Sequence, residues 1–319
     1  MTVRVGVVGA GGVGARHART LAGFPDVELV AVCDSLPGAA EAVARPLGVA
    51  ALGDLDSLLA RRLDGIWLCV PPFAHGELER SVLRAGVPFF VEKPLAADLA
   101  VAEDVAAAVA AAGLPTATGY HWRHLDTVAR ARDALYGATV RLVDARWWGA
   151  CPPPAWWRWQ DRSGGQVVEQ ATHVLDVIRV LAGEVVQVAG VSAPSSADGR
   201  DVADATAAVL RLESGAVGTV STSCVLPSLT AAGVEIVADR ISALVTEDAL
   251  RLRTPDGEQA WTPEIDARIA VDRAFVDVLL GAGPSVGMVD VGEALRTHRL
   301  AWAVAEATRS GAAVRVTAP

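Results

Sequence analysis

The segment Val3–Gly14, with the sequence VRVGVVGAGGVG, constrains the fold of this chain more than any other. Its first six residues are mostly β-branched and apolar, which is typical of a strand buried on both faces of a parallel sheet. Gly9, Gly11 and Gly14 follow in GxGxxG spacing, and helix-compatible residues run on to Leu21. The first glycine permits a tight turn, the second lets the backbone approach a pyrophosphate, and the third lets the helix pack on the strand. The pattern predicts a dinucleotide site at the helix N-terminus.

An acidic residue ends the next predicted strand. Val27–Cys33 is apolar, and Asp34 follows it directly, 20 residues beyond Gly14. A carboxylate at this place accepts hydrogen bonds from the adenosine ribose hydroxyls. The next residues, Ser35, Leu36 and Pro37, include no Arg or Lys to hold a 2′-phosphate. We therefore expect NAD rather than NADP, although Arg16 could reach the site from elsewhere.

Composition excludes several classes of protein. The length of 319 residues fits two domains, and 52% hydrophobic with 20% charged residues predicts a large core rather than disorder. A net charge of −9 argues against nucleic acid or an anionic membrane as the main partner. No apolar run reaches the roughly 18 residues of a membrane span, and a chain that starts in a strand predicts no signal peptide. The four scattered cysteines, without a CxxC pair, predict reduced thiols in a cytoplasmic protein and no metal site.

The pattern of elements changes near residue 120. Before it, strands alternate with helices, which predicts an α/β, doubly wound parallel sheet. The strands expected there are Arg4–Val8, Val27–Cys33, Gly65–Val70, Pro88–Val91 and Thr116–Tyr120, with a helix at Leu99–Ala112. After it we expect the helices Asp126–Tyr136, Gly165–Leu181, Ile265–Leu280 and Val291–Arg309, and the strands Thr139–Trp148, Val185–Val191, Ala203–Leu212 and Ala216–Cys224.

These elements predict two domains. Residues 1–120 form an NAD-binding Rossmann domain, and residues 121–319 form an α+β domain for substrate and oligomerisation, with one large, mostly antiparallel sheet. The last helix, about 290–310, is expected to pack back toward the first domain. The hairpin Ala203–Cys224 carries many small and apolar residues, and no helices remain for one face of its sheet. An uncovered apolar face usually has a partner, so we expect a homodimer or a dimer of dimers.

Two motifs carry candidate acid–base chemistry. Glu92-Lys93-Pro94 follows a predicted strand at the sheet edge where ligands bind, so Lys93 can touch a substrate, although a surface lysine is the alternative. On one continuous helix, Glu169, His173 and Asp176 would share a face. A histidine oriented by a carboxylate is a candidate general base. A metal site or a salt-bridged helix face is the alternative.

Aromatic residues are concentrated in a third region. Five of the nine tryptophans, Trp147, Trp148, Trp156, Trp157 and Trp159, lie within thirteen residues. Such rings can stack on sugars, and Arg158 or Arg162 can bind an anionic group; a core or a subunit interface is the alternative.

Together these motifs resemble the Gfo/Idh/MocA oxidoreductases, the family of glucose–fructose oxidoreductase and inositol dehydrogenase. The resemblance is carried by GxGxxG, Val70-Pro71-Pro72 with His75, Glu92-Lys93-Pro94, Gly119-Tyr120 with Arg123, and Gly164-Gly165 leading to Glu169-x-x-x-His173-x-x-Asp176. It implies hydride transfer between NAD and a secondary alcohol or ketone of a sugar, sugar derivative or cyclitol. Lys93 would bind the reacting oxygen and His173 would move the hydroxyl proton. Glu169 stands where the family usually has aspartate, and His121-Trp122 departs from the common Asn-Arg-Arg.

The resemblance and the motifs define the expected site. Catalytic residues are Lys93, His173 and Glu169. Cofactor contacts are expected from Gly9, Gly11, Gly12, Val13, Gly14, Asp34, Ser35, Val70, Pro71, Pro72, His75, Glu92 and Lys93. Substrate contacts are expected from Lys93, Tyr120, Trp122, Arg123, Trp156, Trp157, Arg158, Trp159, Glu169 and His173. Two alternatives remain: a non-catalytic NAD-sensing protein, and a hydrolase that uses tightly bound NAD transiently.

Overall fold

The chain forms two compact units in a computed structural model that describes residues 1–197 and 199–317. The first unit contains residues 1–96, 100–120 and 268–295, and the second contains residues 97–99, 121–267 and 296 onward. The segment 268–295, which the sequence placed in the second domain, therefore groups with the first unit. Its helix α10 (Ala267–Leu279) supplies Val271, Phe275 and Val276 to the core of that unit.

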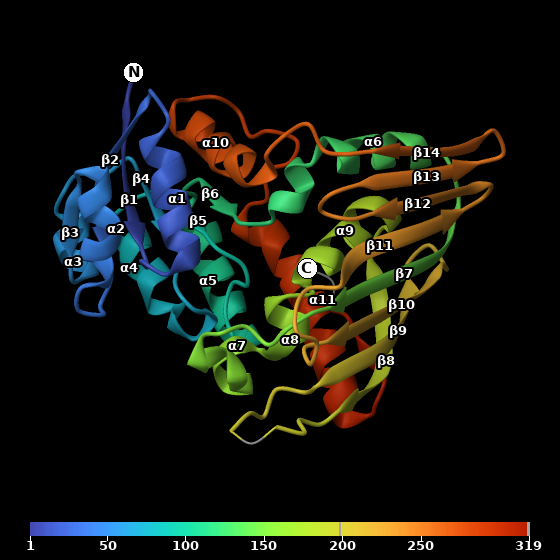
Figure 1. Ribbon diagram of the computed structural model, residues 1–319. Helices are drawn as coiled ribbons and strands as arrows, with labels where there is room; N and C mark the ends of the chain where they lie inside the picture. The colour runs from blue at the N-terminus through green and yellow to red at the C-terminus, as the bar shows by residue number, and fades with distance from the viewer. Residues whose placement is uncertain (198, 318–319) are drawn as a thin grey trace. The chain divides into compact units, whose positions relative to one another are not determined.

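The first unit is built on a parallel sheet, as predicted, but the sheet has six strands, and the strand at Ala50–Leu52 was not among the five expected (Figure 1). Its strand order, β3-β2-β1-β4-β5-β6, reverses between β1 and β4, the arrangement that puts helices on both faces of a doubly wound sheet. The strands are β1 (Val3–Val8), β2 (Val27–Cys33), β3 (Ala50–Leu52), β4 (Gly65–Leu68), β5 (Phe89–Val91) and β6 (Thr116–Thr118). The helices are α1 (Gly12–Ala22), α2 (Ala39–Leu47), α3 (Leu55–Leu59), α4 (Glu77–Arg84) and α5 (Leu99–Ala112), with a short 3-10 helix, η1 (Pro72–Ala74).

Aromatic side chains fill the space between this sheet and α10. The ring of Trp67 stacks on Phe90 with centroids 5.8 Å apart and meets Phe275 edge-on at 5.2 Å. All three side chains are fully buried. Each of these rings removes a large apolar surface from water, which ties α10 to the strands.

The second unit is built on a nine-stranded sheet with the order β14-β13-β12-β11-β7-β10-β9-β8-β15. Its described neighbours are antiparallel except β7 and β10, which are parallel. The strands are β7 (Val140–Trp148), β8 (Val185–Ala193), β9 (Ala205–Leu212), β10 (Val217–Ser223), β11 (Ala231–Ala238), β12 (Ile241–Val245), β13 (Leu250–Thr254), β14 (Gly257–Trp261) and β15 (Val314–Arg315). The helical elements are η2 (His121–His124), α6 (Asp126–Leu135), η3 (Ala155–Arg158), α7 (Gln160–Ser163), α8 (Gly165–Glu169), α9 (Thr172–Ala182) and α11 (Val291–Ser310). The start of α11, up to residue 295, belongs to the first unit.

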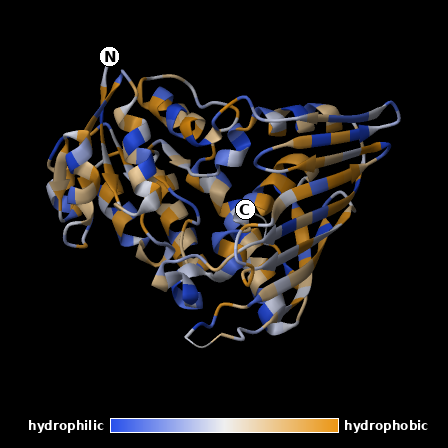
Figure 2. Ribbon diagram, in the orientation of Figure 1, coloured by the Kyte–Doolittle hydropathy of each residue, from blue (hydrophilic) through white to orange (hydrophobic). Residues whose placement is uncertain are grey.

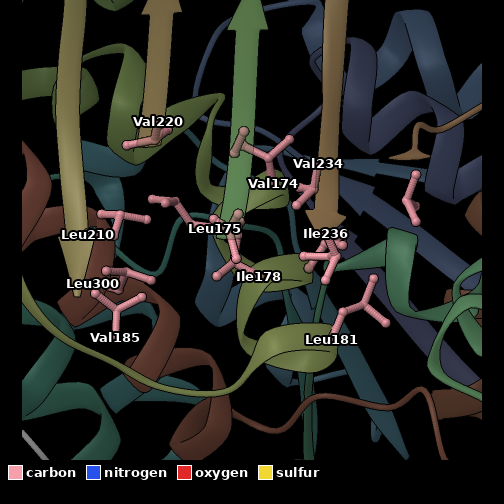
Figure 3. Packing of buried hydrophobic residues seen from close by; sticks show 14 of the residues in the cluster. Val174, Leu175, Ile178, Leu181, Val185, Leu210, Val220, Val234, Ile236 and Leu300 are labelled. Carbon is pink, nitrogen blue, oxygen red and sulfur yellow. The ribbon is translucent and has the colours of Figure 1, made fainter. Parts of the chain in front are cut away.

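One face of the large sheet forms the core of the second unit. Along β9, buried and exposed residues alternate, as a sheet with one covered face requires; Figure 2 shows the same alternation in hydropathy along several strands. Figure 3 shows α9 presenting Leu175 and Ile178 toward the strands, near Leu210 and Ile236.

The helix predicted over Gly165–Leu181 is two helices, so that prediction was wrong. α8 ends at Glu169 and α9 begins at Thr172. Between them the N–H of Ala171 bonds the carbonyl of Gln166, five residues back, which widens the turn. The Gln166 side chain is anchored to the carbonyl of Ser223 at 2.8 Å. Glu169 therefore does not share a continuous helical face with His173 and Asp176.

None of the helices in the described part of the chain combines the length and the apolarity needed to cross a bilayer.

Candidate active site

Two glycines of the glycine loop are closely packed against backbone, and two others face open space. Gly9 has φ +96°, and a Cβ there would lie 2.3 Å from the carbonyl oxygen of Cys69. A Cβ on Gly14 would lie 1.8 Å from the carbonyl oxygen of Gly9. Around Gly11 and Gly12, by contrast, no described atom lies within 4 Å of such a Cβ. The open stretch lies at the N-terminus of α1, so it fits a pyrophosphate held by backbone N–H groups. Val13 is also exposed there.

The carboxylate of Asp34 is fixed at the end of β2. Its Oδ2 accepts the N–H of Ala10 at 2.7 Å, and its Oδ1 accepts the N–H of Leu36 at 2.8 Å. A carboxylate oxygen can accept more than one hydrogen bond, so both oxygens retain capacity for ribose hydroxyls. Ser35 beside it is exposed.

The loop after β4 is braced by a buried pair. This loop contains Val70 and Pro71 and continues into η1 at Pro72. The Nδ1 of His75 lies 2.5 Å from Oε1 of Glu79, whose Oε2 accepts the N–H of Gly76 at 2.6 Å. Burial alone raises the pKa of Glu79, but the charge and hydrogen bond of His75 outweigh it, so the pKa is lowered. The His75 ring is buried and engaged with Glu79, so it positions the loop in which we expected cofactor contacts.

Glu92 and Lys93 follow the end of β5, where the sequence placed them. The peptide between Lys93 and Pro94 is cis. The Glu92 carboxylate is buried: its Oε1 lies 2.9 Å from Nε2 of His17 and 3.4 Å from Nη2 of Arg16, and its Oε2 accepts the N–H of Lys93 at 3.0 Å. The Lys93 side chain is half-buried.

His17 and Asp272 complete this arrangement, and the sequence analysis missed both. The Nδ1 of His17 lies 2.6 Å from Oδ1 of Asp272, which also accepts the indole N–H of Trp67 at 2.8 Å. Burial lowers the pKa of His17, but the charges and hydrogen bonds of Asp272 and Glu92 outweigh it and raise the pKa to about 9. Burial raises the pKa of Glu92, but His17, followed by Lys93 and Arg16, lowers it to about 2.

In the second unit, His173 lies among other rings. Its imidazole stacks on Trp122 and Trp147, with centroids 6.1 and 5.9 Å away, and meets the ring of His121 edge-on at 4.8 Å. His121 in turn bonds Oε1 of Glu247 at 3.0 Å. Trp122 is buried, so it holds the His173 ring and offers no exposed face of its own to a ligand. A motif centred on 169–176 could not reveal His121, Trp147 or Glu247.

Asp176 binds an arginine instead of sharing a face with Glu169. Its two oxygens accept Nε and Nη2 of Arg123 at 2.7 and 2.6 Å, and Oδ1 also accepts the Thr297 hydroxyl at 2.7 Å. The guanidinium expected to contact substrate is thus held in a bidentate pair, a geometry of high specificity.

The tryptophan-rich loop splits into buried and exposed residues. Trp157 is fully buried in a small cluster with Val202 and Cys224, and its Nε1–H donates to Glu169 at 2.8 Å. Direct stacking of Trp157 on a sugar was therefore a wrong expectation, because no face of the ring is exposed. Trp156 is half-buried, and Arg158 and Trp159 are exposed. Tyr120, after β6, is buried in the first unit.

Within residues 1–197 and 199–317, no three His, Cys, Asp or Glu side chains gather as a metal site would require.

Comparisons with known proteins agree with this architecture. The model described as "oxidoreductase family, NAD-binding Rossmann fold" matches residues 3–120, and the GFO/IDH/MocA C-terminal domain matches residues 136–243. A myo-inositol dehydrogenase of Streptomyces leeuwenhoekii is 34% identical over 230 residues, 68% of each protein. An inositol 2-dehydrogenase of Rhizobium meliloti is 32% identical over 188 residues, 58% of this chain and 56% of the relative. The structure of levoglucosan dehydrogenase with NADH, 19% identical, covers all of both chains with a TM-score of 0.89 and shows the same fold. The chain belongs to the Gfo/Idh/MocA family of oxidoreductases.

Proposed function

We propose that the protein is an NAD(H)-dependent dehydrogenase acting on a secondary alcohol or ketone of a sugar, sugar derivative or cyclitol. One observation carries the proposal: Lys93 leaves the end of β5 beside a buried Glu92 carboxylate, in the same sheet whose β1–α1 turn is open at Gly11 and Gly12. The names of the relatives, inositol dehydrogenases, support this substrate class.

NAD, when bound, supplies the hydride chemistry, and the protein supplies position and proton handling. The Lys93 ammonium donates a hydrogen bond to the reacting oxygen and stabilises its developing negative charge. His173 takes the hydroxyl proton during oxidation and returns it during reduction. Glu169, whose carboxylate accepts the indole N–H of Trp157, is assigned one of two roles: it orients His173, or it tunes Lys93 through its negative charge.

We propose NAD rather than NADP as the cofactor. Asp34 stands where a 2′-phosphate would meet like charge, and no Arg or Lys follows it in Ser35, Leu36 or Pro37. The Arg16 guanidinium, the other basic group that could reach the site, donates to Glu92 at 3.4 Å.

We assign substrate recognition to the expected contact residues that are not fully buried, which include Arg123, Trp156, Arg158 and Trp159. The bidentate pair with Asp176 fixes the direction of Arg123. Trp156 and Trp159 retain exposed surface for stacking on a ring, and Arg158 is exposed beside them for an anionic substituent. Trp156 packs against the cluster that contains buried Trp157.

We further propose a homodimer or a dimer of dimers that pairs through the large sheet. Opposite its helices, this sheet has a shallow hollow of about 460 Å³, and apolar residues stand exposed on it, among them Leu142, Val209 and Val217. Their register places Val217 beside Leu142. Contiguous apolar surface of this kind usually marks an interface.

The free state of all four cysteines supports a cytoplasmic location.

The proposal is tested by screening sugars and cyclitols for NADH absorbance with the purified protein. Stoichiometric, continuing NADH formation that is lost in Lys93→Met is the expected result. NAD binding without turnover would indicate a sensor. Substrate cleavage without net NADH would indicate a hydrolase.

A further inference from the structure

A row of buried charged side chains runs from α10 to the base of Lys93. In order it contains Asp272, His17 and Glu92, joined by contacts of 2.6 and 2.9 Å, and it ends on the backbone N–H of Lys93 at 3.0 Å. His17 and Asp272 are wholly shielded from solvent, and Glu92 is nearly so. Three charged side chains are costly to bury, so their retention in this place calls for a role.

The contacts indicate the charge on each member. A carboxyl oxygen lies against each ring nitrogen of His17, and an ionised carboxylate only accepts hydrogen bonds. With both carboxyl groups ionised, both ring nitrogens carry a proton, so His17 is an imidazolium between two carboxylates. Nη2 of Arg16 lies farther away, 3.3 Å from Nε2 of His17, and that contact is then between like charges and not a hydrogen bond. The raised pKa of His17 and the lowered pKa of Glu92 agree with this assignment.

Glu92 has little freedom in this setting. A Cβ on Gly119 would lie 2.6 Å from its carboxylate, so the backbone after β6 closes one side of the group. The charged or titratable groups around Glu92 are Arg16 and His17 of α1, Cys69 after β4, Lys93 beside it and, through His17, Asp272 of α10.

We propose that His17 and Asp272 are positioning residues of the dehydrogenase reaction: they hold Glu92 ionised and immobile against the backbone of Lys93, and so keep the Lys93 side chain an oriented ammonium. The inference rests on the proposed function. It adds two residues, one from α1 and one from α10, that touch neither substrate nor cofactor and act through Glu92.

The test compares His17→Gln, Asp272→Asn, the double variant and Glu92→Gln, with Trp67→Phe as the control. The control removes one hydrogen bond to Asp272 and leaves the three charges in place. We expect kcat to fall about tenfold or more in the first three variants, with KM for NAD within about threefold, because the loss is in transition-state stabilisation. The control should stay within about twofold of wild type.

The pH profile separates positioning from mere packing. Removing a negative charge beside an ammonium makes its proton easier to lose. Because His17 holds Glu92 ionised, Glu92 loses its negative charge in His17→Gln as it does in Glu92→Gln. The alkaline limb of kcat should therefore move to lower pH in both variants and stay in place in Trp67→Phe. Equal kcat in wild type and His17→Gln, or an alkaline limb that stays in place or moves to higher pH in His17→Gln, would overturn the inference.

Two further measurements cover variants that do not fold. The double variant loses one positive and one negative charge. Unlike His17→Gln alone, it therefore leaves no Asp272 carboxylate buried without a positive partner. In the wild-type protein, ¹⁵N spectra of the histidines should show both nitrogens of His17 protonated at pH 7.5, and a neutral ring would refute the proposal. If the wild type oxidises no sugar or cyclitol, the proposed function fails, whereas the spectra still decide the charge of His17.

Discussion

The indole N–H of Trp157 donates a 2.8 Å hydrogen bond to the carboxylate of Glu169. The ring belongs to a buried cluster with Val202 and Cys224, so the carboxylate is held by a residue of fixed position. The Glu169 side chain, one methylene longer than that of an aspartate, ends on this indole.

Trp157→Phe should keep the ring and delete the donor. We expect unfolding free energy to fall by about 1 kcal/mol, because a buried hydrogen bond is lost, and kcat/KM to fall about tenfold as Glu169 loses its anchor. Exposed Trp159, changed to Phe, is the matched control and should preserve stability. Unchanged kcat/KM in Trp157→Phe would show that the anchored carboxylate has no part in turnover.

Cofactor preference should follow Asp34. We expect NAD to bind at least about tenfold more tightly than NADP, roughly 1.4 kcal/mol, measured by calorimetric titration. Asp34→Ala should narrow the gap mainly by weakening NAD, because the ribose hydroxyls lose their acceptor. Equal affinities in the wild type would contradict the assignment.

Lys93→Met retains the length of the side chain and deletes its charge. Turnover should fall about 100-fold or more, because charge on the reacting oxygen is no longer stabilised. Affinity for NAD should stay within a few-fold. A variant with near wild-type turnover would reduce Lys93 to a structural residue.

His173 should set the pH dependence of alcohol oxidation. A general base works when neutral, so the rate should rise with pH through its apparent pKa and then level off. His173→Ala should lose most of the rate, and the remaining activity should lack this rise. A flat wild-type profile from about pH 5 to 9, with chemistry rate-limiting, would count against the role.

Stability should depend on pH through His17. Its pKa is raised from 6.5 to about 9 on folding, so its contribution is fully present below pH 6.5 and is lost as the pH rises through about 9. The loss between these limits is about 3 kcal/mol. Urea unfolding across this range measures it, and His17→Gln should show a flatter slope. An identical slope in both proteins would rule out His17 as its origin.

The parts of the site that are local in sequence were predictable. The strand, glycine turn and helix of the cofactor loop lie within residues 3–22, and their spacing is set by backbone contact alone. Asp34 and Lys93 were found because each follows an apolar strand, where ligands meet a parallel sheet.

Long-range pairs and one helix break were not predictable. His17 and Asp272 are 255 residues apart, and Arg123 and Asp176 are 53 apart, so no spacing rule links them. The break after Glu169 is accompanied by a tertiary contact, the hydrogen bond from the Gln166 side chain to the carbonyl of Ser223. The helical spacing of apolar residues continues across the break between α8 and α9, so the sequence predicted one helix.

The return of α10 to the first unit sets an order of events during synthesis. The sheet of that unit is complete once residue 118 has been made, yet Phe275 and Asp272 emerge about 150 residues later. Until then, the strands lack the helix that covers Trp67 and Phe90, and His17 lacks one of its two counter-ions. This face of the first unit stays uncovered while strands β7 to β14 of the large sheet are translated. The core of the first unit is therefore complete only once residues up to 279 have been made, even though the unit contains the N-terminus.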